Sequence, residues 1–164
     1  MQADILLSEA LPEDLEAELK EWFNDFGADT RVRSIPVRRG WAEAQWLVLA
    51  TIPLQAFMSA FVAQTAADAY ARMKSLARRL AKSNPHQSRD YHPFVLQDSV
   101  TKLKVVLEPD LPAVALRELA DLDLTQFKHG PLHYDLARSQ WRSEIDEIEQ
   151  QQRRRRRSTK RAKD

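Results

Sequence analysis

The chain contains no cysteine among its 164 residues. This excludes disulfide bonds, thiolate zinc sites and cysteine nucleophiles. It has only three glycines, Gly27, Gly40 and Gly130, and none lies in a glycine-rich pattern of the kind that cradles nucleotide phosphates. The amino-terminal segment lacks the basic start and long apolar core of a secretion signal, so none is expected there. The remaining composition, 43% hydrophobic and 30% charged, is ordinary for a globular protein.

Charge is also absent from the segment 44–67, which reads AQWLVLATIPLQAFMSAFVAQTAA. Its length exceeds the roughly 20 residues that a membrane-spanning helix needs. Three glutamines lie within it, and arginines or lysines flank it on both sides, whereas a span usually shows a one-sided basic bias. Two interpretations therefore remain open. We expect a helix buried in protein or at an oligomer interface, and the alternative is a small membrane-associated protein anchored by 44–67.

The sequence predicts one long helix over about 41–83, with an amphipathic second half from Val62 onward. The apolar faces of its two halves are out of phase at 100° per residue, so one straight helix cannot lay both on the same core. Either the helix kinks at Pro53, or its first half is covered on all sides. We predict that the helix interacts with a partner or a second copy through four apolar side chains: Leu54, Phe57, Met58 and Phe61.

The rest of the chain predicts alternating short strands and helices. Apolar residues at helical spacing after Pro12, followed by Gly27, predict a helix over Leu11–Phe26. A strand on each side, Asp4–Leu7 and Thr30–Val37, gives a βαβ-like opening. Two hairpins are predicted, one of 94–97 with 100–108 that turns at Asp98-Ser99 and one of 132–135 with 140–142. Two more helices are predicted, one over 112–122 and a terminal one over 144–152 that is capped by Ser143.

These elements predict an α+β fold, in which a small sheet packs on the long central helix. Residues 1–143 form the single domain, 144–152 the terminal helix, and 153–164 a basic, disordered tail. Eight of the 25 lysines and arginines lie in 153–164 beside one aspartate, giving the tail a charge of about +7 and leaving residues 1–152 at about −6. We expect weak polyanion contact, with nucleic acid or anionic lipid, through seven residues: Arg153, Arg154, Arg155, Arg156, Arg157, Lys160 and Arg161.

No catalytic or cofactor motif is present. His129 and His133 are four residues apart, a spacing that suits a metal on a helix, but Gly130-Pro131 between them excludes a helix. Asp121 and Asp123 could be interpreted as paired carboxylates for acid–base chemistry, but they are better placed to end a helix. We therefore expect no enzyme activity, no cofactor and no metal site.

The segments DLEAELKEWF and TRVRSIPVRRG, followed by an uncharged stretch that runs into ARMKSLARRL and then by a hairpin, give a layout over about residues 4–108. This layout resembles the small α+β domains called effector-associated constant components, which accompany bacterial conflict and signalling systems. The resemblance implies a non-enzymatic adaptor or assembly role in a bacterial defence or signalling system. Our leading hypothesis is a cytoplasmic, non-catalytic interaction module that self-associates or docks a protein partner. A third hypothesis is a nucleic-acid-binding accessory protein that uses its basic tail.

Overall fold

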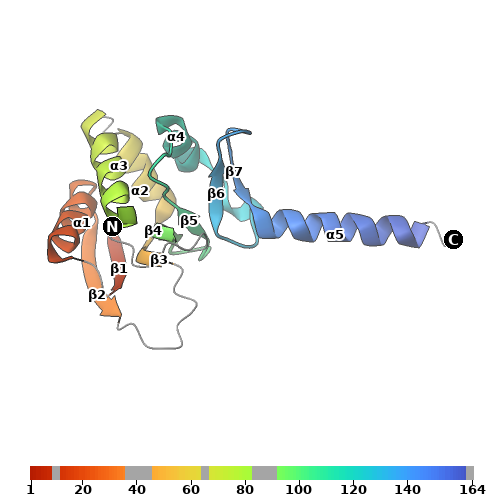
Figure 1. The fold of residues 1–164 in the computed structure, drawn as a ribbon, viewed down its shortest axis with the longest axis horizontal. Helices are drawn as coiled ribbons and strands as arrows, with labels where there is room; N and C mark the ends of the chain where they lie inside the picture. The colour runs from red at the N-terminus through yellow and green to blue at the C-terminus, as the bar shows by residue number, and fades with distance from the viewer. Residues whose placement is uncertain (9–11, 36–45, 64–66, 83–91, 162–164) are drawn as a thin grey trace.

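A computed structural model describes residues 1–8, 12–35, 46–63, 67–82 and 92–161 (Figure 1). Helices and strands are interspersed along the chain, which confirms the predicted mixed α and β class. The strands are β1 (Gln2–Ser8), β2 (Asp29–Ile35), β3 (Trp46–Ile52), β4 (His92–Asp98), β5 (Lys104–Val106), β6 (Leu132–Asp135) and β7 (Gln140–Ser143). The helices are α1 (Glu13–Asp25), α2 (Leu54–Ala63), α3 (Ala67–Lys82), α4 (Ala113–Asp121) and α5 (Glu144–Arg161), with a short 3₁₀ helix at Leu124–Gln126.

The seven strands in the described part of the chain belong to one mixed sheet in the order β2-β1-β3-β4-β5-β6-β7. Parallel pairs, β1 with β2, β3 with β4 and β5 with β6, alternate with antiparallel pairs along the sheet. Strand β3 lies between β1 and β4, so it is a central strand. Strands β2 and β7 form the two edges, and β7 leads directly into α5.

Helices α1 to α4 cover one face of the sheet, and the main core lies between them and the strands (Figure 1). Side chains alternate along each strand between the two faces. Ile5 and Leu7 therefore face the helices, whereas Leu6 packs with a smaller apolar cluster on the opposite face. Trp141 of β7 donates a hydrogen bond from Nε1 to the carbonyl of Ala115 in α4, at 2.9 Å. This bond ties the last hairpin to the helical layer.

The predicted helix over 41–83 is wrong in its first part. Residues Trp46–Ile52 form the central strand β3, and Pro53 separates this strand from α2. Every residue from Leu47 to Ala50 is buried, because both faces of the strand are covered. A strand covered on both sides has a continuous apolar sequence instead of an alternating one, and such a run cannot be told from a buried helix by periodicity. The mismatch of phase has a different origin: residues such as Phe57 lie on α2 and later ones such as Met73 lie on α3, two helices that were treated as one.

The amino-terminal prediction is confirmed. Strand β1, helix α1 and the parallel strand β2 follow one another as expected. Pro12 precedes the first helical residue, and its carbonyl accepts from the amides of Leu15 and Glu16. Gly27 ends the turn after α1 with a φ of 73°, a left-handed conformation that glycine adopts without a Cβ clash.

Both predicted hairpins are present. The first has a wider turn than expected, because β5 starts only at Lys104 and residues 99–103 form the connection. The second hairpin pairs β6 with β7 over the residues that the sequence predicted. The predicted end of the terminal helix at Gln152 is wrong, since α5 continues to Arg161 through most of the segment that we expected to be a disordered tail. Arginine is a good helix former, which offsets the repulsion among neighbouring charges.

None of the helices in the described part of the chain is both long and apolar enough to cross a membrane.

Candidate polyanion-binding helix

The four residues predicted as an interaction surface are core residues. Leu54, Phe57, Met58 and Phe61 of α2 are all buried within the chain. Trp22 of α1 packs its ring edge-on against Phe57, with ring centroids 5.4 Å apart. The aromatic cluster between α1 and α2 is therefore filled by the chain itself. The prediction that these residues contact a partner is corrected, because the apolar surface that motivated it is already covered.

Helix α5 begins at a well-defined cap. The hydroxyl of Ser143 accepts a hydrogen bond from the amide of Asp146 at 3.2 Å, as the sequence predicted for an N-cap. The same hydroxyl donates to the carbonyl of His129 at 2.6 Å. One buried side chain thus both starts the helix and fixes it to the segment that precedes β6.

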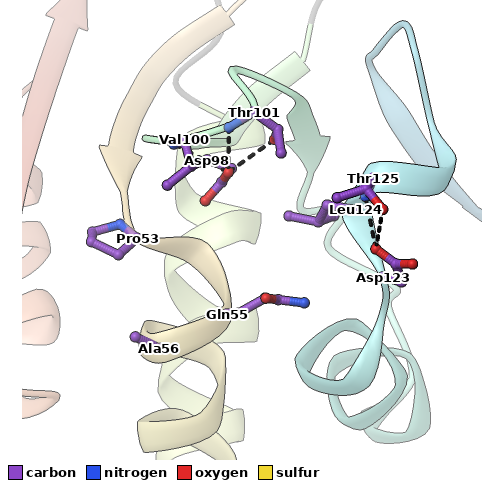
Figure 2. A pocket seen from close by; sticks show the side chains of 9 residues that line it. All are labelled: Pro53, Gln55, Ala56, Asp98, Val100, Thr101, Asp123, Leu124 and Thr125. Atoms are coloured by element: carbon purple, nitrogen blue, oxygen red, sulfur yellow. Dashed lines mark hydrogen bonds between the residues drawn. The ribbon is translucent and has the colours of Figure 1, made fainter.

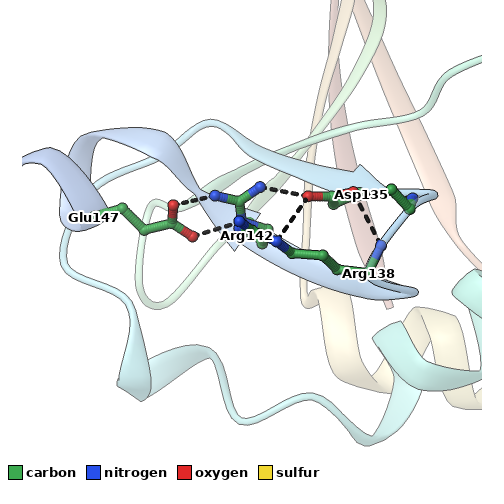
Figure 3. Close-up of polar contacts among 5 residues, drawn as sticks. Asp135, Arg138, Arg142 and Glu147 are labelled. Carbon is green, nitrogen blue, oxygen red and sulfur yellow. Dashed lines mark hydrogen bonds and ion pairs between the residues drawn. The ribbon is translucent and has the colours of Figure 1, made fainter.

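Arg142 fixes the first turn of α5 to the last hairpin (Figure 3). Its guanidinium donates from Nε to Oε1 of Glu147 at 2.5 Å, and a second bond from Nη2 to Oε2 makes the pair bidentate. Its Nη1 donates to Asp135, whose carboxylate also accepts from the amides of Ala137 and Arg138 in the hairpin turn. Arg142 lowers the pKa of both Glu147 and Asp135, so both carboxylates remain charged well into the acidic range.

Asp146 holds the other side of the same helical turn. It accepts from the backbone amide of Lys128 at 2.8 Å, and its second oxygen lies 2.9 Å from Nδ1 of His129. Burial alone would raise the pKa of Asp146, but the hydrogen bonds from Lys128 and His129 outweigh it and the net pKa is lowered. Helix α5 is therefore attached by polar contacts from two directions within its first turn.

Beyond this anchored turn, α5 projects away from the body of the protein (Figure 1). An 18-residue helix is about 27 Å long, because each residue adds about 1.5 Å. Residues from Gln150 to Arg154 are all exposed. The seven basic residues predicted to contact polyanions occupy positions 153–157, 160 and 161 of this helix, and five consecutive positions go once around its axis.

Acidic residues of the body are partly paired within the chain. Arg72 of α3 lies 2.5 Å from Asp25 of α1, and Arg79 lies 2.5 Å from Asp14 and closer still to Glu18. These ion pairs join α1 to α3 across the surface of the helical layer. The longest basic run in the sequence is the five arginines at positions 153–157 of α5.

A cavity of about 270 Å³ lies between the start of α2, the β4–β5 turn and residues 123–125 (Figure 2). Its buried carboxylate, Asp98, accepts from the amide of Leu54 at 3.1 Å and so caps α2. The other oxygen accepts from the amides of Val100 and Thr101 and from the Thr101 hydroxyl. Burial raises the pKa of Asp98, but these four bonds outweigh it and the net pKa is lowered.

Asp123 on the opposite wall of this cavity is also engaged by its own turn. Its Oδ1 accepts from the amide of Thr125 at 3.0 Å and from the Thr125 hydroxyl at 2.6 Å. Asp121, its proposed partner for acid–base chemistry, lies at the end of α4. The cavity is thus lined by carboxylates that stabilise a helix start and two turns.

His129 and His133 lie beside carboxylates, and His129 has two of them, with Glu149 3.8 Å away in addition to Asp146. His129 faces Asp146, and Nδ1 of His133 lies 3.5 Å from Oε1 of Glu108. Within the described ranges, no group of three or more histidine, cysteine, aspartate or glutamate side chains is arranged to hold a metal ion. His86 lies outside the described residues.

No family model, curated protein or solved structure matches this chain. The resemblance to effector-associated constant components therefore stays a prediction.

Sequence reasoning identified the basic residues of α5 and the Ser143 cap, but it missed the anchor. Arg142, Asp135 and His129 had no assigned role, because their partners lie up to 17 residues away in the sequence. One signal was available. The run of Glu144, Asp146 and Glu147 beside an upstream arginine indicates local charge pairing at the start of a helix.

Proposed function

We propose that the protein is a non-catalytic interaction module that binds nucleic acid through the basic half of α5. One observation carries this proposal, namely that the longest basic run, five consecutive arginines, lies on a helix that projects from an otherwise acidic chain (Figure 1). The folded domain that precedes α5 supports this helix. The polar anchor formed by Arg142, Ser143 and Asp146 sets the direction in which the helix leaves the body.

The projection separates the cations from the negative charge of the body. Position 153 lies nine residues beyond Glu144, which corresponds to about 14 Å along the helix axis. The Debye length is about 10 Å at 0.1 M salt. Repulsion between the acidic body and a phosphate backbone is therefore largely screened where the basic half of α5 makes its contact.

Nucleic acid fits this helix better than a membrane surface does. A helix that lies in a membrane interface needs an apolar face that enters the lipid. The segment 150–161 reads QQQRRRRRSTKR and contains no apolar residue. Attraction to phosphates is then purely electrostatic, and a duplex presents phosphates along both walls of a groove that admits a helix. The lack of aromatic residues in this segment also argues against base stacking.

The test is a fluorescence-anisotropy titration of a labelled 20-base-pair duplex at 0.1 M salt. Each phosphate contact contributes about eightfold to affinity at this salt through counterion release. Glutamine at Arg153, Arg154 and Arg155 preserves helix propensity. One or two of these three consecutive residues can face the duplex, so affinity should fall by about eightfold to sixtyfold. The matched control places glutamine at three other exposed arginines, Arg31, Arg33 and Arg117, and removes the same charge.

We expect the control variant to bind within about threefold of the wild type, since its arginines lie on β2 and α4, far from the basic half of α5. Equal losses in the two variants would reject α5 as the contact. A parallel titration with vesicles containing phosphatidylserine separates the two polyanions. Stronger binding to vesicles than to the duplex at the same salt would replace nucleic acid by anionic lipid as the partner.

A further inference from the structure

Strand β2 forms an open edge of the sheet. It stands last in the order of the described strands, with β1 on one side only. It has seven residues, whereas the other edge strand, β7, has four. An edge strand presents a row of backbone amides and carbonyls with which another chain can pair, and proteins commonly limit this by keeping edge strands short. The length of β2 therefore makes it the better of the two edges for an added strand.

The outward backbone groups of β2 follow from one hydrogen bond. The amide of Asp29 donates to the carbonyl of Met1 at 2.7 Å, so the backbone groups of Asp29 point toward the β1 side. The direction of these groups reverses from one residue to the next along a strand. The outward amides and carbonyls therefore belong to three residues of β2: Thr30, Val32 and Ser34. Within the described ranges, no other segment forms backbone hydrogen bonds with them.

The side chains of β2 place two cations beside this edge. Val32 is the register partner of Ile5 and packs against the main core, so it faces the helices. Arg31 and Arg33 lie on the opposite face, because side chains alternate along a strand. Both are exposed, and neither forms an ion pair with a described residue. Residues two apart in a strand are separated by about 6.6 Å, which matches the spacing of alternate side chains in any other extended chain.

A second copy of β2 does not suit this edge. The antiparallel register that pairs all seven residues centres on Val32 and sets Arg31 opposite Arg33 of the second copy, twice. Like charges directly opposite each other in a sheet are destabilising, whereas opposite charges stabilise the pair. The charge of the edge therefore favours a strand that carries carboxylates at two alternate positions.

We propose that β2 binds an extended acidic segment of a protein partner as an added strand of the sheet. The backbone of this segment pairs with the outward groups of Thr30, Val32 and Ser34. Two acidic side chains of the segment, two residues apart, face Arg31 and Arg33. The residue between them is apolar, because it lies beside Val32 on the face that the helices cover. The ligand is thus an extended segment of the pattern acidic, apolar, acidic.

Hydrogen exchange followed by NMR tests the backbone pairing. The probe is a labelled peptide with the central sequence Glu-Val-Glu. In the free protein the amides of Thr30, Val32 and Ser34 should exchange fast, and saturating peptide should slow them by at least about tenfold. A control peptide with proline in place of the valine lacks the central amide and should bind more weakly by about two- to twelvefold. Unchanged exchange with bound peptide, or protection of these amides by a second copy in the free protein, would overturn the proposal.

Fluorescence anisotropy with the same peptide tests the charges. Arg31→Gln/Arg33→Gln should weaken binding by about two- to thirtyfold, the range expected for two cross-strand ion pairs. Arg31→Glu/Arg33→Glu should reverse the preference, so that this variant binds a Lys-Val-Lys peptide more tightly than the Glu-Val-Glu peptide. Ser34→Ala keeps every backbone group and both arginines, and it should bind as the wild type does. Absence of binding to the wild type, or an unchanged preference in the charge-reversed variant, would overturn the proposal.

The basic half of α5 also attracts acidic peptides, so its contribution is measured separately. Glutamine at Arg153, Arg154 and Arg155 should leave affinity for the Glu-Val-Glu peptide within about threefold of the wild type. A larger loss there than in Arg31→Gln/Arg33→Gln would place the peptide on α5 and reject β2. Duplex binding without peptide binding rejects only the β2 proposal, and peptide binding without duplex binding rejects only the nucleic-acid proposal.

Discussion

Asp98 should be the most sensitive single polar residue for stability. Its carboxylate is buried and accepts four hydrogen bonds, one from the first amide of α2 and three from the β4–β5 turn. Removing a helix cap typically costs about 0.5–2 kcal/mol, and each bond to a charged group contributes about 1.5–3 kcal/mol. Because the turn donors are only part-buried and water replaces some of these bonds, we expect Asp98→Ala to lower the free energy of unfolding by about 3 kcal/mol.

The assay is urea unfolding followed by tryptophan fluorescence at pH 7. Asp123→Ala is the matched control, since Asp123 makes the same kind of turn contact at an exposed position. The control should move the unfolding midpoint much less than Asp98→Ala does. Midpoints shifted equally, or a loss below about 0.5 kcal/mol at Asp98, would show that the buried cap does not carry the stability that its geometry implies.

The contribution of Asp98 to the stability of the fold should decrease at acidic pH. The pKa of Asp98 is lower in the folded protein than its usual value, so its stabilisation is fully present above a pH of about 4 and is lost as pH falls through the folded pKa. Asp98→Asn removes this titration. The stability difference between wild type and Asp98→Asn should therefore shrink steadily below a pH of about 4. A difference that stays constant between pH 5 and pH 2 would contradict the assigned charge state.

Two further predictions concern the core and the anchor of α5. Phe57→Ala should lower the free energy of unfolding by about 3–5 kcal/mol, because it leaves a cavity in the aromatic cluster. The control Val114→Ala, at an exposed position, should change the free energy of unfolding little. Comparable urea midpoints for the two variants would contradict this prediction. Arg142→Gln should speed hydrogen exchange of the amides in the first turn of α5 without affecting β1 and β3, because it releases Glu147 and Asp135 while the main core remains intact. Uniformly faster exchange throughout the chain would mean that Arg142 supports the whole fold.

The sequence was sufficient wherever one element has one buried face. Helix α1 shows apolar residues at helical spacing between Pro12 and Gly27, and both of its limits were close to those found. It was insufficient for β3, whose apolar residues face two covered sides and therefore show no period. Pro53 was considered as the site of a helix kink, but it lies between β3 and α2. Whether a proline kinks a helix or joins a strand to a helix depends here on the neighbouring strands β1 and β4.

The sequence predicted which basic residues form the candidate site, but it did not predict that they lie on a long helix or in which direction that helix points. The basic residues of 153–161 are evident from composition, and Ser143 was identified as a cap from local spacing. The length of α5 was missed, because a dense run of like charge favours disorder while arginine itself favours helix, and the sequence does not show which prevails. Its direction depends on long-range contacts of Arg142 and Asp146 that no local pattern encodes.

The central claim is that the basic half of α5 binds phosphates, and the slope of log affinity against log salt tests it most directly. Seven cations distributed around the axis cannot all face one duplex, so about four contacts are expected, with a slope of about −3.6. Affinity should then fall about 150-fold between 50 and 200 mM salt. Replacing Arg153, Arg154 and Arg155 by glutamine should bring the slope to between about −2.7 and −1.8, because only one or two of three consecutive helical residues can face the duplex. A slope near zero for the wild type, or an identical slope for this variant, would contradict the account.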